Sequence, residues 1–161
     1  MSIGHFLGGV AALIWDPADG RYLALRRSAS KDFGRGDWEC VTGRVDQGES
    51  YAQAVRREAR EEIGAEIQIE FIVALTHFYR GAAVPENELL GVIFGCTLAE
   101  GQTAAMLGDE HSEMRWAAPG ELDALLPEQH WMGEAIRRAE RLRRLLPEEL
   151  RQAMRDEGLQ M

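Results

Sequence analysis

The chain has 161 residues, of which 45% are hydrophobic and 28% are charged, and its formal net charge is −9 at pH 7. This length and composition predict one globular domain over residues 1–161 that folds without a disulfide or a structural metal. Because nucleic acids and anionic membranes are bound by clustered Lys and Arg, the acidic balance argues against both as partners.

Apolar runs separated by polar segments indicate the first strands. Residues 5–15 and 21–27 flank a turn rich in Asp, Pro and Gly, a pattern typical of a β-hairpin. The polar residues 28–37 predict a loop, and residues 38–41 predict a further short strand.

The clearest helix covers residues 50–63. Ser50 can cap its start, and Gln53 completes a capping-box pattern. Gly64 supplies the stop signal at the other end. Its apolar residues recur at helical spacing and form one stripe, made of Ala52, Val55, Ala59 and Ile63.

The second half of the chain continues with strands and ends in helices. We predict strands at residues 67–79, 89–97 and 114–116. We predict helices at residues 119–125, at 130–146, and from Pro147 to about Gly158. This order fits an α/β sandwich with a helical C-terminal extension that starts at about residue 128.

An acidic surface lies on the helix at 50–63, next to its apolar stripe. Since each helical residue turns by ~100°, Glu58, Glu61 and Glu62 lie within about 100° of one another. Each like-charge pair costs roughly 0.2–0.5 kcal/mol even on an exposed helix. A hard divalent cation removes this repulsion, and Mg²⁺ suits a few carboxylates together with substrate phosphates, with Mn²⁺ as a substitute.

The residues around these three acids fit a metal site. Glu49 and Arg57 can pair and hold the acidic ligands in place. Gly43 permits a sharp turn that brings the Thr42 carbonyl towards the same cation. The alternative interpretation is an ordinary solvated Glu-rich helix, but a chance match at all the fixed Gly, Glu and Arg positions has a probability of about 10⁻⁵ over the chain.

The segment from Gly43 to Ala65 resembles the Nudix box, G-x5-E-x7-R-E-U-x-E-E-x-G-U, where U is a bulky aliphatic residue. Every charged and glycine position matches, while Ala59 and Ala65 stand where larger aliphatic residues are usual. The resemblance implies a Nudix-type α/β/α sandwich with a mixed central sheet. It also implies attack of water on a phosphorus within a diphosphate that is linked to a nucleoside or similar group.

The same resemblance implies roles for individual residues. Glu58, Glu61 and Glu62 would bind the cation, and Arg57 would act with Glu49 as an orienting residue. Family members often take their general base from outside the box or from one of its glutamates. Glu113 is our first candidate for this base and Glu110 the second, and a solvated loop acid is the alternative for both.

Residues that contact the substrate are less clearly indicated. We expect phosphate contacts from Arg27, Arg35 and Arg44, and base stacking from Trp38 or Tyr79. Solvated loop charges are the alternative for the arginines, and core packing is the alternative for Trp38.

Two other observations concern location and assembly. Cys40 and Cys96 have neither zinc-site nor disulfide spacing, no run approaches the ~20 apolar residues of a membrane helix, and the apolar start lacks the features of a signal peptide. We therefore predict a cytoplasmic protein. The basic helix at 130–146 predicts a solvated face, and a homodimer surface there stays open as an alternative.

The sequence thus predicts a Nudix hydrolase acting on a small nucleotide-like molecule. A non-catalytic nucleotide-sensing module would keep the fold but has no need of three converging acids. An interaction protein would leave the crowding of those acids unexplained.

Overall fold

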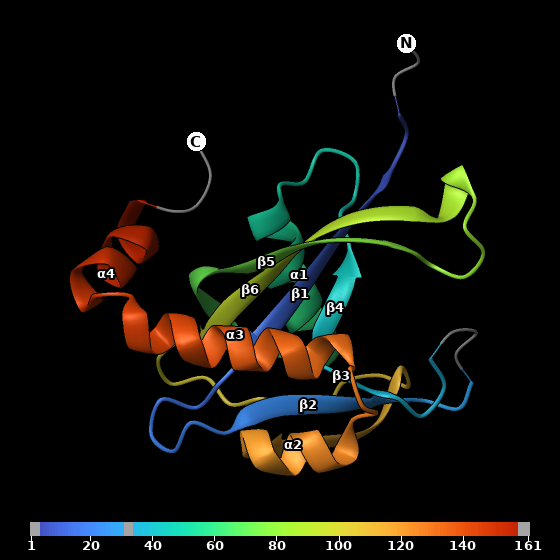
Figure 1. Ribbon diagram of the computed structural model, residues 1–161. Coiled ribbons are helices and arrows are strands. Elements are labelled where there is room, and N and C mark those ends of the chain that lie inside the picture. Colours follow the sequence, from blue (N-terminus) through green and yellow to red (C-terminus); the bar gives the residue numbers. More distant parts are fainter. Residues whose placement is uncertain (1–3, 31–33, 158–161) are drawn as a thin grey trace.

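Two β-sheets and the helices around them make up the computed structural model, which describes residues 4–30 and 34–157 (Figure 1). The strands are β1 (Leu7–Ile14), β2 (Tyr22–Arg27), β3 (Trp38–Glu39), β4 (Val41–Arg44), β5 (Ile67–Tyr79), β6 (Glu88–Leu98) and β7 (His111–Ala117). The helices are α1 (Tyr51–Ile63), the short 3-10 helix η1 (Pro85–Asn87), α2 (Pro119–Leu125), α3 (Trp131–Leu145) and α4 (Glu148–Glu157).

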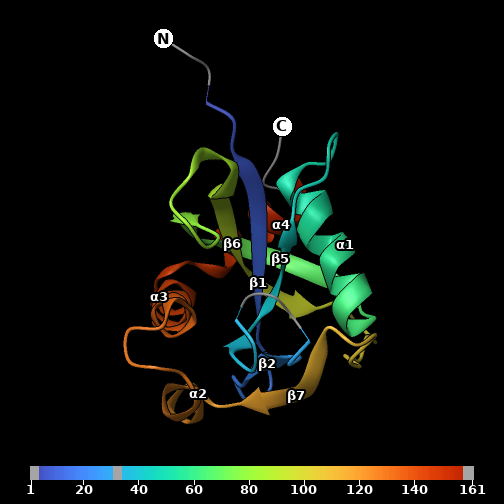
Figure 2. The same ribbon diagram turned by 90° about the vertical axis from the view of Figure 1, so that its right-hand side faces the viewer.

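The larger sheet is mixed and has the strand order β4-β1-β6-β5. Strand β1 pairs antiparallel with β4 and parallel with β6, and β6 pairs antiparallel with β5. Helix α1 covers one face of this sheet and α3 the other, as the side view shows (Figure 2). The predicted α/β/α sandwich with a mixed sheet is therefore confirmed.

A second sheet, with the antiparallel order β3-β2-β7, was not predicted. The predicted hairpin between β1 and β2 is wrong, although the turn between them forms. After a single antiparallel bridge between Trp15 and Tyr22, the two strands separate into different sheets. The physical reason is that β6 pairs with all of β1 on one edge and β4 pairs with residues 9–12 on the other, so only the last residues of β1 have a free edge and they cannot hold the whole of β2.

The helix ends follow the sequence signals closely. Ser50 caps α1: its hydroxyl accepts a hydrogen bond from the Gln53 amide at 3.1 Å, and the Gln53 side chain accepts from the Ser50 amide at 2.8 Å. Gly64 ends the helix in the left-handed conformation at φ 61°. Strand β7 begins at His111, three residues earlier than predicted, and the predicted end of the last helix at Gly158 lies outside the described residues.

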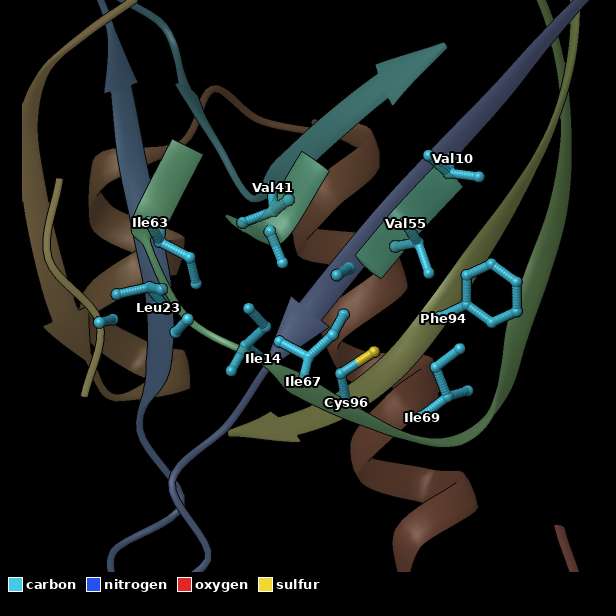
Figure 3. Close-up of a cluster of buried hydrophobic side chains, with 14 of the residues drawn as sticks. Val10, Ile14, Leu23, Val41, Val55, Ile63, Ile67, Ile69, Phe94 and Cys96 are labelled. Atoms are coloured by element: carbon cyan, nitrogen blue, oxygen red, sulfur yellow. The ribbon is translucent and has the colours of Figure 1, made fainter. Parts of the chain in front are cut away.

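The apolar stripe of α1 is buried in the core between this helix and the sheets (Figure 3). Val55, Ala59 and Ile63 are fully buried against strand residues such as Val41 and Phe94. Burying a Val or Ile side chain contributes roughly 1.5–3 kcal/mol, so the packing of Val55 and Ile63 fixes the rotation of α1 about its axis. The neighbouring glutamates are thereby held at the end of β4. None of the helices within residues 4–30 and 34–157 has the length and apolarity to cross a bilayer.

Candidate active site

Arg57 connects the loop after β4 to the acidic side of α1. Its Nε and Nη2 atoms donate to the two carboxylate oxygens of Glu49 at 2.8 and 2.9 Å, and Nη2 also donates to the Arg44 carbonyl at 2.9 Å. Its Nη1 atom donates to Glu58 at 2.8 Å and to Glu61 at 3.2 Å. One guanidinium therefore holds the loop and two acids of the helix in a fixed arrangement.

Glu49 closes the loop from its other end. Its Oε2 atom also accepts a hydrogen bond from the Asp46 amide at 3.1 Å. Hydrogen bonds from Arg57, and then from that amide, lower the pKa of Glu49 to about 2. Glu49 is consequently ionised at any ordinary pH, and the predicted pairing of Glu49 with Arg57 is present.

Gly43 allows Glu58 to approach the backbone of β4. A Cβ atom at Gly43 would lie 1.8 Å from the Glu58 carboxyl carbon, a distance no pair of non-bonded atoms can adopt. Burial is the main cause that raises the pKa of Glu58, and the nearby charges of Glu61 and Glu110 act in the same direction. A larger residue at this position would therefore displace the Glu58 side chain from its observed place.

Glu62 is the most buried acid of the helix, at 7% exposure. Its Oε2 atom has no hydrogen-bond partner among the described residues. Burial raises the pKa of Glu62 to about 9, the charges of Glu39 and Glu58 add to the effect, and a hydrogen bond from the Thr42 amide opposes it. An unpartnered buried carboxylate is costly on its own and is a suitable oxygen ligand for a hard cation.

A divalent cation therefore suits this set of residues, although its ligands are not yet gathered. Among residues 4–30 and 34–157, no three His, Cys, Asp or Glu side chains lie together at metal-ligand spacing. Arg57 occupies one oxygen of Glu58 and one of Glu61. To reach a shared cation with Glu62, those two side chains have to turn away from the guanidinium.

The two candidates for the general base lie in different surroundings. The loop that carries Glu110 contacts α1, because the Leu107 amide donates to the Glu62 carbonyl at 2.9 Å. The charge of Glu110 accordingly helps to raise the pKa of both Glu58 and Glu62. Glu113 is on β7, where it accepts a hydrogen bond from Arg115 at 2.7 Å and lies 3.8 Å from Arg26. The loop of Glu110, our second candidate, therefore lies beside the helix that carries the box acids.

Glu39 is a buried acid beside the site that the sequence did not reveal. It is 8% exposed and accepts hydrogen bonds from Arg27 at 2.8 Å, His111 at 3.0 Å and the Thr42 hydroxyl at 3.3 Å. Its contact with His111 spans 72 positions of the sequence. The one available signal was a charged residue inside a short apolar strand, which has to be satisfied once buried.

The predicted substrate-contact residues are spread over several places. Arg27 is engaged with Glu39, whereas Arg35 and Arg44 are exposed. Trp38 is buried in the core on the α3 side, with the Arg115 guanidinium 5.3 Å from its ring centre, as its core-packing alternative anticipated.

Tyr79 lies at the far end of β5, on the hairpin that extends beyond the sheet (Figure 1). It is exposed, and its ring packs edge-on against His77 at a centroid distance of 5.7 Å. A bound molecule would have to be long enough to extend from the acids of α1 to this hairpin if it were to contact Tyr79.

The sequence model of the NUDIX domain matches residues 5–139, and the chain therefore belongs to the NUDIX family. An isopentenyl-diphosphate Delta-isomerase of Kocuria rhizophila is 33% identical over 128 residues, which cover 74% of this chain and 69% of the relative. The nucleoside triphosphatase NudI of Salmonella agona is 29% identical over 111 residues, with coverages of 65% and 77%. The crystal structure of a MutT protein from Methanosarcina mazei shares the fold, with a TM-score of 0.70, 23% identity and coverages of 89% and 99%.

Proposed function

We propose that this Nudix hydrolase uses Mg²⁺, with Mn²⁺ as a substitute, to cleave the diphosphate linkage of a nucleoside diphosphate derivative or a nucleoside triphosphate. The observation that supports this most strongly is the buried carboxylate of Glu62, whose Oε2 atom lacks a partner among the described residues. The charges of Glu39, Glu58 and Glu110 all help to raise the pKa of Glu62. A divalent cation would neutralise the negative charge that these carboxylates place around it.

Four groups would hold the cation: the carboxylates of Glu58, Glu61 and Glu62, and the carbonyl of Thr42. A bound Mg²⁺ supplies positive charge for the phosphate oxygens and acidifies the attacking water. Because carboxylate ligands must be ionised, Glu62 has to release the proton that its raised pKa retains. Gly43, Glu49 and Gly64 keep the loop and helix in place, and Arg57 holds Glu58 and Glu61 until they turn.

Glu110 is our preferred proton acceptor, ahead of Glu113. A general base must come within about 2.6–3.2 Å of the proton it takes, directly or through one water. The charge of Glu110 helps to raise the pKa of Glu58 and of Glu62. Glu113, in contrast, accepts a hydrogen bond from Arg115 on β7. The phosphates of the substrate would meet Arg44, which is exposed and whose carbonyl is bound by Arg57, and Arg35, which is also exposed.

The names of the two relatives support the proposal that this protein recognises linked phosphates in its substrate. The name of one of them refers to a nucleoside triphosphate, and the name of the other to isopentenyl diphosphate. Both molecules contain linked phosphates, which a cation held by carboxylates would bind. Attack of water on phosphorus separates the linkage, whereas an isomerase leaves the diphosphate intact, so the products distinguish the two activities.

A substrate panel with Mg²⁺ tests the proposal. Nucleoside triphosphates, nucleoside diphosphate derivatives and isopentenyl diphosphate are incubated with the protein, and released phosphate, pyrophosphate and isomer are measured. We expect phosphate or pyrophosphate from a nucleotide, and Glu62→Gln should abolish this release. Glu66→Gln is the matched control, because Glu66 is an exposed acid that pairs with Arg60 just beyond the helix. Binding of nucleotides without any turnover would instead indicate the sensing module.

The predictions on location and partners stay predictions. The acidic net charge argues against nucleic acid and membrane partners, the Nudix box implies a small nucleotide-like substrate, and the cytoplasmic location is a separate prediction from the sequence. A homodimer through α3 can be tested by sedimentation of the protein at several concentrations.

A further inference from the structure

We propose that Glu39 and His111 are positioning residues that hold Glu110 against the acids of α1. This inference rests on the proposed function, since Glu110 is the proton acceptor in that proposal. It concerns residues outside the Nudix box, and their contact joins β3 to the start of β7.

The contact between Glu39 and His111 is buried and directional. The His111 side chain is 1% exposed, and its Nε2 atom lies 3.0 Å from Oε1 of Glu39. An ionised carboxylate only accepts hydrogen bonds, so the proton of this contact belongs to Nε2. The Nδ1 atom has no partner among the described residues, which fits an imidazole whose orientation is determined by Glu39 alone.

Glu39 joins three segments that carry groups of the site. Its Oε1 atom accepts from Arg27 of β2 and from His111 of β7, and its Oε2 atom accepts from the Thr42 hydroxyl of β4. A buried carboxylate needs several donors to offset its desolvation, and here every donor comes from a different strand. The carboxylate therefore fixes the distances between these strands beside the acids of α1.

The connection from His111 to Glu110 is a single peptide bond. On the outer side of this segment, the Ser28 amide donates to the Glu110 carbonyl at 2.9 Å, and the Ser28 hydroxyl donates to the Asp109 carbonyl at 2.6 Å. His111 anchors the segment from the inner side. With both sides held, the backbone of residues 109–111 has a fixed path, and this path sets the place from which the Glu110 side chain extends.

The loop between β6 and β7 also contacts α1 before it reaches Glu110. The Leu107 amide donates to the Glu62 carbonyl at 2.9 Å, and the Ala105 amide donates to the Ile63 carbonyl at 2.9 Å. The loop between β6 and β7 therefore follows the end of the helix that carries the acids. At the end of this loop, His111 begins β7, and its side chain reaches the buried Glu39.

The first experiment compares disruptive with conservative variants. Glu39→Ala and His111→Ala remove the contact, whereas Glu39→Gln and His111→Gln keep an acceptor or a donor at nearly the same place. Residues that orient catalytic ligands typically contribute 10–100-fold. We expect the Ala variants to lower kcat by about 10–100-fold with KM for the nucleotide changed less than about threefold, and the Gln variants to restore most of kcat.

The second experiment tests whether His111 acts through Glu110. If it does, adding His111→Ala to Glu110→Gln should lower kcat no further than about twofold, because the group being positioned is already gone. A merely structural role predicts that the two effects multiply. Glu70→Gln is the matched control: Glu70 is also a buried acid, paired with Thr97 and Arg155 away from the site, and we expect it to leave kcat unchanged.

Backbone amide exchange of residues 107–112 is a readout that needs no turnover. We expect His111→Ala to speed exchange in this segment at least about tenfold while the strands of the larger sheet exchange as before. Unchanged exchange in residues 107–112, or effects of Glu110 and His111 that multiply, would overturn the inference. A wild-type protein that hydrolyses no nucleotide would contradict the proposed function, and the exchange measurement would then decide the positioning role by itself.

Discussion

At the residue scale, Gly43 determines how near Glu58 comes to the backbone of β4. Any Cβ at this position would overlap the Glu58 carboxylate, so Gly43→Ala must push that side chain away from β4, whose Thr42 carbonyl would share the cation with it once it has turned from Arg57. A displacement of about 1 Å in a group that positions the reaction can cost about 100-fold in rate. We therefore expect Gly43→Ala to reduce kcat by about 100-fold and to weaken Mg²⁺ binding, as measured by steady-state kinetics and metal titration.

A second glycine provides the comparison for this prediction. Gly120 lies in the first turn of α2, and a Cβ there has no described atom within 4 Å. Gly120→Ala should leave kcat unchanged and should not lower the unfolding temperature, because Ala favours a helix over Gly by up to about 1 kcal/mol. Equal losses of activity in the two variants would show that the close approach of Glu58 to Gly43 has no catalytic importance.

Residues of the site differed in how well the sequence predicted them. The pairing of Arg57 with Glu49 was accessible because both residues belong to one local pattern of fixed spacing. Glu39 and His111 were not, since each stands alone in the sequence and their contact exists only after two distant strands have met. The choice between Glu110 and Glu113 likewise depends on the path of one loop in three dimensions.

At the scale of single elements, the start of α1 depends on its capping box. Ser50 satisfies the Gln53 amide, which would otherwise remain without an intrahelical partner. We expect Ser50→Ala to lower the free energy of unfolding by about 1 kcal/mol, and Ser50→Gly to lower it by only a few tenths. Urea unfolding followed by circular dichroism measures both changes, and kcat per folded molecule should stay at the wild-type value. An Ala variant as stable as the wild type would contradict the role of the cap.

Helices and strands were predicted better than the pairing between strands. Capping residues, stop glycines and apolar periodicity act locally, so α1 and the C-terminal helices appeared in the sequence with nearly their observed bounds. The sheet to which a strand belongs is decided by competition among distant partners. Strand β1 pairs with β6 along its length and with β4 over residues 9–12, and β2 pairs instead with β3 and β7 in a second sheet.

At the scale of the whole molecule, stability without metal should fall as the pH rises. The pKa of Glu62 is raised from its ordinary value of 4.5 to about 9, so the folded state binds this proton more tightly than the unfolded chain. The contribution of Glu62 is fully present below about pH 4.5 and is lost as the pH approaches about 9. Thermal unfolding in EDTA from pH 5 to 9.5 measures it as the difference between wild type and Glu62→Gln, which lacks this proton. A difference that is independent of pH would contradict the raised pKa.

Mg²⁺ should reverse this loss, because it replaces the proton as the positive partner of Glu62. A ligand that binds only the folded state stabilises it by about 2.7 kcal/mol at 100 times its dissociation constant. At pH 8 we therefore expect Mg²⁺ to raise the unfolding temperature and to release protons into a weak buffer, since Glu62 ionises on binding. Sodium chloride at equal ionic strength is the control for general screening of the net charge of −9. Stabilisation of the same size by sodium, or in Glu62→Gln, would mean that Mg²⁺ acts on the overall charge and not at this carboxylate.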